Sequence, residues 1–140
     1  MEIGFLYAIG AAITWGLVYS IDEKILGNVT PIAFIFISSI ITPILILPFV
    51  LRSGLKATLS SGVENFPIII LSVVLGLFAN FFILSGIKNL NASTASIIEI
   101  SYPFFVLLFS FIIFRTTPNL YFFLGGILVF IGSVIIIKFA

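Results

Sequence analysis

The chain alternates between long apolar stretches and short segments that hold nearly all of its charged residues. Each apolar stretch is about 20 residues long, the length that a helix needs to cross a hydrocarbon core about 30 Å thick. Backbone groups in lipid must pair within their own segment, so helices are the expected form. The pattern predicts an all-α integral membrane protein with five transmembrane helices, at residues 3–21, 31–51, 66–87, 92–114 and 119–137.

Capping residues support these boundaries. Thr30 and Thr117 each precede a proline where a span should begin, and Asn91 precedes the fourth span. Side-chain oxygens before a helix, and proline in its first turn, are typical of helix starts. The connections around the fourth span are very short, so the third, fourth and fifth helices should be antiparallel neighbours. We expect one membrane domain over residues 1–140.

Composition removes several classes of protein. Of the 140 residues, 61% are hydrophobic and 8% are charged, with no cysteine and no histidine. Globular domains carry about 25% charged residues, so a soluble enzyme is excluded. A net charge of +1 without a basic run gives no basis for binding nucleic acid. Without thiols and imidazoles there is no disulfide, no thiolate or imidazole metal site and no Cys or His catalysis, and we expect no cofactor.

Lysine and arginine give no preferred orientation. Positively charged residues usually favour the cytoplasmic loops, yet here the two faces carry three each. Five spans place the termini on opposite sides, so an inverted second copy would recreate the inverted repeats on which many transporters are built. We therefore expect an antiparallel homodimer with dual topology, or an inverted paralogous partner. The residues counted are Arg52, Lys56 and Arg115 on one face, and Lys24, Lys88 and Lys138 on the other.

Small residues mark two faces where helices could approach closely. In the first span they recur every four residues, and in the fifth Gly125 and Gly132 are seven apart. Such strips are common at helix contacts in membranes, so we interpret both as packing faces. The strip of the first span is Gly4, Ala8, Ala12 and Gly16.

Three sequence patterns together resemble one half of a drug/metabolite transporter of the EamA type. The first span carries Ala-Ala-Ile-Thr-Trp-Gly at residues 11–16, and the last span has the glycines 125 and 132. A small-residue-rich segment, residues 86–96, leads to Tyr102 and Pro103. The resemblance implies a single five-helix repeat. Full-length members have ten helices and move metabolites, amino acids or drugs, whereas shorter relatives act as dimers. The chain departs from the family pattern at Ser38 and Ser39, and at Arg115.

Glu99 is the most informative polar residue because it lies inside the fourth span. An ionisable group there costs at least about 2.5 kcal/mol on insertion scales and usually faces protein or water. It could bind a proton and a cationic substrate in alternation. Pro103, four residues later, lacks an amide hydrogen and predicts a kink near Glu99. Alternatively, the carboxyl is structural and bonded to a Ser, Asn or Tyr of another helix.

Other polar and aromatic side chains could line a cavity with Glu99. Trp15 and Tyr19 share a face of the first span, where aromatic rings can stack on flat or cationic substrates, or simply pack. Asn80, midway along the third span, could bond a ligand or another helix. We expect spans one, three and four to form a substrate-binding cavity with Trp15, Tyr19, Asn80, Glu99 and Tyr102.

The sequence thus favours a multi-pass transporter of the cell membrane that moves small metabolites or drug-like molecules. It would work by alternating access as an antiparallel dimer, with proton coupling through Glu99. The alternative is a non-transporting scaffold or regulatory subunit of a membrane complex, in which every polar group would be engaged between helices. A lipid enzyme is the weakest reading because no paired carboxylates, metal ligands or nucleophile–base set is present.

Overall fold

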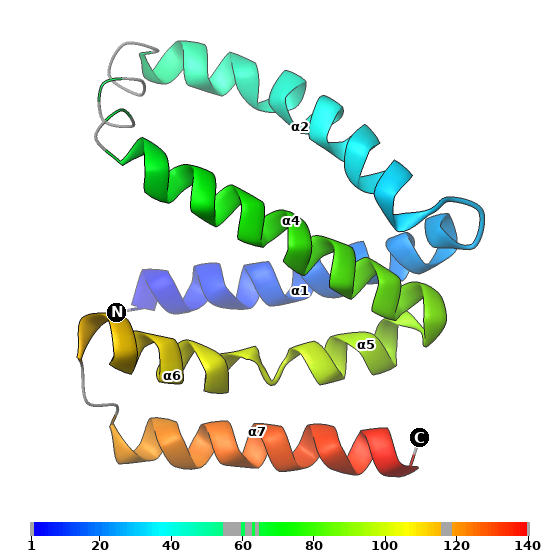
Figure 1. Ribbon diagram of the computed structural model, residues 1–140, viewed down its shortest axis with the longest axis vertical. Helices are drawn as coiled ribbons and strands as arrows, with labels where there is room; N and C mark the ends of the chain where they lie inside the picture. The colour runs from blue at the N-terminus through cyan, green and yellow to red at the C-terminus, as the bar shows by residue number, and fades with distance from the viewer. Residues whose placement is uncertain (1, 55–59, 61–62, 64, 116–118, 140) are drawn as a thin grey trace. The chain divides into compact units, whose positions relative to one another are not determined.

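A computed structural model describes residues 2–54, 60, 63, 65–115 and 119–139, and these contain helices and no strands (Figure 1). The all-α prediction is confirmed. The helices are α1 (Glu2–Leu26), α2 (Pro31–Ser53), α4 (Phe66–Asn89), α5 (Ala92–Glu99), α6 (Tyr102–Phe114) and α7 (Leu120–Phe139).

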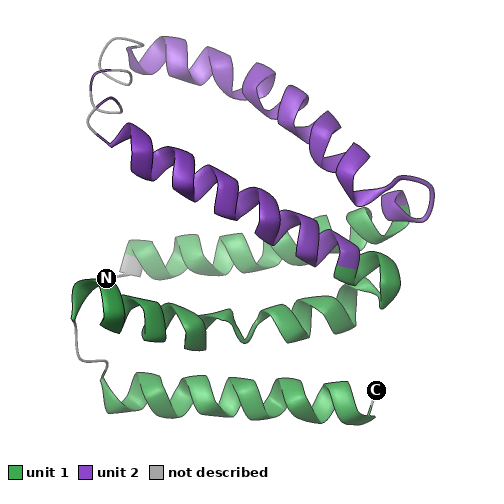
Figure 2. Cartoon of the chain, in the orientation of Figure 1, with its two compact units in different colours: residues 1–24, 86–140 green, residues 25–85 purple. Residues whose placement is uncertain are grey.

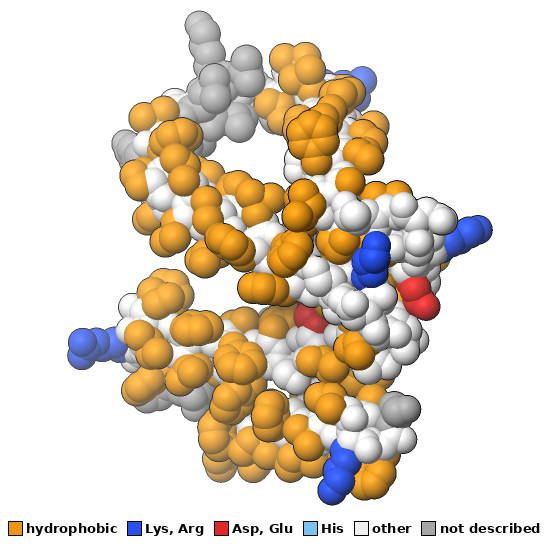
Figure 3. Space-filling model, turned by 45° about the vertical axis from the view of Figure 1, so that its right-hand side comes forward, with side chains coloured by type: hydrophobic (Ala, Val, Ile, Leu, Met, Phe, Trp, Pro, Cys, Tyr) orange, Lys and Arg blue, Asp and Glu red, His pale blue; other side chains and the backbone are white. Residues whose placement is uncertain are grey.

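Five segments of the described chain are long and apolar enough to cross a membrane, with α5 and α6 together making the fourth. This confirms the five-helix architecture. Hydrophobic side chains cover the visible face of the helices, and charged side chains are few (Figure 3). The helix α1 extends five residues beyond the predicted end at residue 21, through Asp22, Glu23 and Lys24. With a rise of about 1.5 Å per residue, this helix of 25 residues is longer than the hydrocarbon core is thick. The helix can therefore continue beyond the end of its apolar segment.

The chain divides into two compact units (Figure 2). Unit 1 comprises Met1–Lys24 and Gly86–Ala140, which include most of α1 and all of α5, α6 and α7. Unit 2 is Ile25–Ser85, with α2 and most of α4. The boundary after Lys24 lies within the last turn of α1, and the boundary after Ser85 lies within the last four residues or so of α4. The last residues of these two helices therefore belong to a different unit from the rest of the helix.

In unit 1, α7 packs against both halves of the fourth span. Gly126 and Ser133, seven residues apart, are the buried residues of α7. A Cβ at Gly126 would lie 3.8 Å from Leu107 Cδ1 of α6, whereas one at Gly125 or Gly132 would meet nothing within 4 Å. The predicted seam at Gly125 and Gly132 is therefore not used within unit 1, where the contact lies one residue further along the helix, and its pairing with another chain stays a prediction.

The small-residue strip of α1 is open. A Cβ added at Gly4 or Gly16 would meet no atom of the described chain within 4 Å. Ala8 and Ala12 are exposed as well. The expected packing face is thus not used within unit 1.

Local capping explains several helix starts. Thr30 Oγ1 accepts a hydrogen bond from Ala33 N at 3.3 Å, with Pro31 in the first turn of α2. Asn91 Oδ1 accepts from Thr94 N at 2.7 Å. Both caps confirm the predicted ones. The predicted cap at Thr117, before Pro118, lies outside the described residues; at this end of α7, Asn119 Oδ1 accepts from Tyr121 N at 3.1 Å.

Candidate functional site

Glu99 is the last residue of α5, at a break in the fourth span. The two residues between α5 and α6, Ile100 and Ser101, have φ/ψ of −60°/−7° and −71°/−12°. These angles, together with i→i+3 bonds from Ser101 N to Ile98 O and from Phe104 N to Ser101 O, describe a tight 3₁₀-like turn. The break lies where Pro103 predicts a kink, and it places the half-buried Glu99 at a helix end.

Tyr19 of α1 reaches across to this carboxyl. Its hydroxyl donates a hydrogen bond to Glu99 Oε2 at 2.7 Å. The Trp15 ring lies against that of Tyr19, with centroids 5.4 Å apart and planes at 45°. Trp15 is 53% exposed, so one side of this aromatic pair remains open. Three of the five predicted site residues therefore come together.

A second hydrogen bond joins α1 to α5. Glu23 Oε2 accepts from the backbone N–H of Ala92, the first residue of α5, at 2.7 Å. A carboxylate at this end of a helix satisfies a free donor and interacts favourably with the helix dipole. From Tyr19 to Glu23 along α1, the partners run backwards from Glu99 to Ala92, so the two helices are antiparallel. Sequence reasoning missed the role of Glu23 because the partner is a backbone group 69 residues away.

Two buried serines connect the break in the fourth span to α7 by hydrogen bonds. The Ser101 hydroxyl donates to Ser133 Oγ of α7 at 3.0 Å, and Ser133 Oγ lies 2.9 Å from the carbonyl oxygen of Ile97. Ser101 is 9% and Ser133 3% exposed. Sequence reasoning missed both residues. The available signals were a serine two residues after Glu99 and another deep within an otherwise apolar span.

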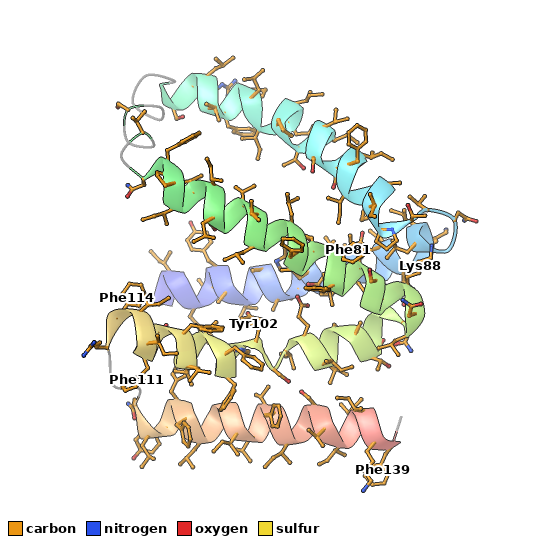
Figure 4. All side chains as sticks on the ribbon, viewed as in Figure 1. Phe81, Lys88, Tyr102, Phe111, Phe114 and Phe139 are labelled. Atoms are coloured by element: carbon orange, nitrogen blue, oxygen red, sulfur yellow. The ribbon has the colours of Figure 1, made fainter. Side chains whose placement is uncertain are left out.

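Tyr102 and Asn80 make no comparable contact with Glu99 in any described hydrogen bond. Tyr102, labelled in Figure 4, is the first residue of α6 and is 59% exposed. Asn80 belongs to unit 2 and donates from Nδ2 to Gly76 O of its own helix at 3.2 Å. The cavity that would unite all five residues stays a prediction.

The polar contacts define what this part of the chain can do chemically. A carboxyl inside a span, paired with a phenol that can be displaced, can hold a proton or a cation. Asp22 lies one turn after Tyr19 and is 6% exposed, so a second acidic side chain is also withdrawn from solvent. Among the described residues, no three acidic side chains are grouped to hold a metal ion.

Comparison with known proteins gives one finding on the family. A sequence model described as the EamA-like transporter family matches residues 2–138. The match includes all three sequence patterns that carry the resemblance, and it includes Tyr19, Glu99 and Ser133. No curated protein and no solved structure matched the chain.

Proposed function

The chain belongs to the EamA-like transporter family, and we propose that it carries small metabolites or drug-like molecules across the cell membrane by alternating access. The family is one of multi-pass transporters of small molecules rather than of enzymes. The observation that carries the proposal is the Tyr19–Glu99 hydrogen bond. It joins an ionisable group within one span to a neutral donor on another.

Glu99 couples transport to protons in this proposal. In the ionised state its carboxylate accepts the Tyr19 hydrogen bond, which offsets part of the cost of holding a charge within a span. Binding of a proton or of a cationic substrate neutralises that charge and weakens the hydrogen bond from the Tyr19 hydroxyl to Glu99. Competition between the two ligands for one carboxyl would make their movements alternate. Trp15, Tyr19, Asn80 and Tyr102 would supply the remaining substrate contacts.

An inverted second copy would complete the transporter. Five spans leave the termini on opposite sides, and the family's ten-helix members contain two such repeats in one chain. The open strip of α1 at Gly4 and Gly16 offers a surface on which another helix could pack closely. Within unit 1, Lys88 and Phe139 lie toward one end and Phe114 toward the other (Figure 4). Lys88, in the last turn of α4, and Lys138 of α7 therefore lie toward one end of unit 1, and Arg115, which follows α6, lies toward the other. Lys56, which is part of that count, lies outside the described residues.

Uptake into proteoliposomes under an imposed pH gradient tests proton coupling. The probes are ethidium, tetraphenylphosphonium and a set of amino acids. Glu99→Gln and Glu23→Gln are a matched pair, because both glutamines keep an oxygen that can accept the hydrogen bond and both lose a charge. We expect pH-driven uptake to be lost in Glu99→Gln alone. Full pH-driven uptake by Glu99→Gln would refute proton coupling. Failure of the unmodified protein to move any probe would favour a non-transporting scaffold.

Labelling of single cysteines tests the dimer, since the natural chain has none. A cysteine at either terminus is reacted with an impermeant maleimide in intact cells. Labelling of both termini, each in a fraction of the molecules, would support an antiparallel homodimer. One fixed orientation would contradict it and favour a paralogous partner.

A further inference from the structure

Ser133 of α7 contacts the fourth span on both sides of Glu99. Its Oγ lies 2.9 Å from the carbonyl oxygen of Ile97, two residues before Glu99. It also accepts a hydrogen bond from the hydroxyl of Ser101, two residues after Glu99. A single side chain thus joins the end of α5 to the turn that follows.

The break leaves a carbonyl that needs this hydroxyl. In a continuous helix the N–H of Ser101 would donate to Ile97 O, but here it donates to Ile98 O at 3.2 Å. An unpaired carbonyl in a membrane span is strongly unfavourable because no water is there to pair with it, so another donor must replace the lost one. Ser133 is the described side chain that does so.

We infer that Ser133 is a positioning residue for Glu99: its hydroxyl holds the broken conformation of the fourth span in which the carboxyl meets Tyr19. Its importance for transport rests on the proposed function, whereas its effect on the Tyr19–Glu99 contact does not. The inference gives α7 a part in the site, although the sequence indicated a helix that would mainly pack or pair.

The same hydroxyl also allows the contact to open. Ser133 has one proton and two carbonyl acceptors within reach, Ile97 O at 2.9 Å and Val129 O of its own helix at 3.0 Å. Rotation toward Val129 would release Ile97 without leaving the hydroxyl unpaired. The fourth span could then straighten, with the N–H of Ser101 donating to Ile97 O as in a continuous helix, and the direction of the Glu99 carboxyl would change with it.

Solid-state NMR in lipid bilayers can test this directly. Protein labelled with ¹³C-tyrosine and ¹³C-glutamate should give a cross-peak between Tyr19 Cζ and Glu99 Cδ, assigned by its absence in Tyr19→Phe. We expect Ser133→Ala to lose most of this peak. The packing control is Leu107→Ala, which removes the side chain facing Gly126 in the α6–α7 contact but leaves both serines in place. It should keep the peak.

Two results would overturn the inference: an unchanged peak in Ser133→Ala, or an equal loss in Leu107→Ala, which would mean that general packing of α7 is responsible. If Ser133→Ala does not insert, Ser133→Cys replaces it, since a thiol is only a weak donor to the carbonyl oxygen of Ile97. The peak should then weaken, and an unchanged peak would again overturn the inference.

Transport is measured separately on the same variants. Ser133→Ala should lower pH-driven ethidium uptake by about threefold, the order of effect expected for one interhelical hydrogen bond in a membrane. Loss of the cross-peak in a chain that moves no probe would reject the proposed function and leave the positioning role intact. An unchanged cross-peak in Ser133→Ala, in a chain that transports the probes, would reject the positioning role and leave the proposed function intact.

Discussion

In unit 1 the side chains of Tyr19, Glu23 and Ser133 hydrogen-bond to other helices, whereas in unit 2 those of Ser38, Ser53 and Asn80 bond to their own helix. A hydrogen bond from a side chain to its own helix does not constrain how that helix is rotated relative to the helices beside it. A bond between helices fixes both their rotation and their register. Polar side chains therefore help to specify how the helices of unit 1 are arranged.

The largest expected effect comes from removing the hydrogen bond between Tyr19 of α1 and Glu99 of α5. Tyr19→Phe removes the donor to Glu99, and hydrogen bonds to charged groups are worth about 1.5–3 kcal/mol. We expect pH-driven ethidium uptake in proteoliposomes to fall roughly tenfold or more. Tyr7→Phe, on an exposed part of the same helix, is the control. Equal activity of the two variants would remove Tyr19 from the mechanism.

The next largest effect should come from overfilling the contact between α6 and α7. Gly126→Leu places a side chain where Leu107 already lies, and overpacking typically costs about 1–3 kcal/mol. The thermal unfolding midpoint in detergent micelles should fall. Gly125→Leu, one residue earlier in open space, should leave it unchanged. A larger loss of stability in Gly125→Leu than in Gly126→Leu would contradict the packing of Gly126 against Leu107.

A smaller, local effect is expected at the start of α5. Glu23→Ala removes the acceptor for Ala92 N–H, and loss of a cap costs about 1 kcal/mol. Deuterium exchange at the Ala92 amide should accelerate about fivefold for such a loss. Thr94 N–H is bonded to Asn91 and serves as an internal reference. Glu23→Gln keeps an acceptor, so exchange as fast as in Glu23→Ala would count against the cap.

The smallest effect should come from unit 2. Asn80→Leu removes a bond that stays within α4, so we expect a change in stability below the roughly 0.6 kcal/mol average for interhelical bonds in membranes. The unfolding midpoint and the KM for ethidium should be measured together. A higher KM at unchanged stability would place Asn80 in the substrate path and weaken the contrast between the units. A clear loss of stability would instead reveal a bond to another helix.

The sequence also predicted part of the candidate site. Glu99 was identifiable because it is the only charge inside the fourth apolar span, and Pro103 because it follows that charge by four residues. Tyr19 and Trp15 were identifiable as neighbours on one helical face. The hydrogen bonds that complete the site involve partners 80, 69 and 32 residues away, and no local pattern gives that information.

The number of spans, their order and caps such as Thr30 and Asn91 could all be predicted from the amino-acid sequence. Apolar length and capping depend only on residues close together in the chain. That Gly126 and Ser133 face the fourth span, rather than Gly125 and Gly132, follows only from how the helices of unit 1 pack. In a membrane the lipid-facing and helix-facing sides are both apolar, so the hydrophobic pattern does not indicate which side turns inward. Packing and the few interhelical hydrogen bonds make that choice.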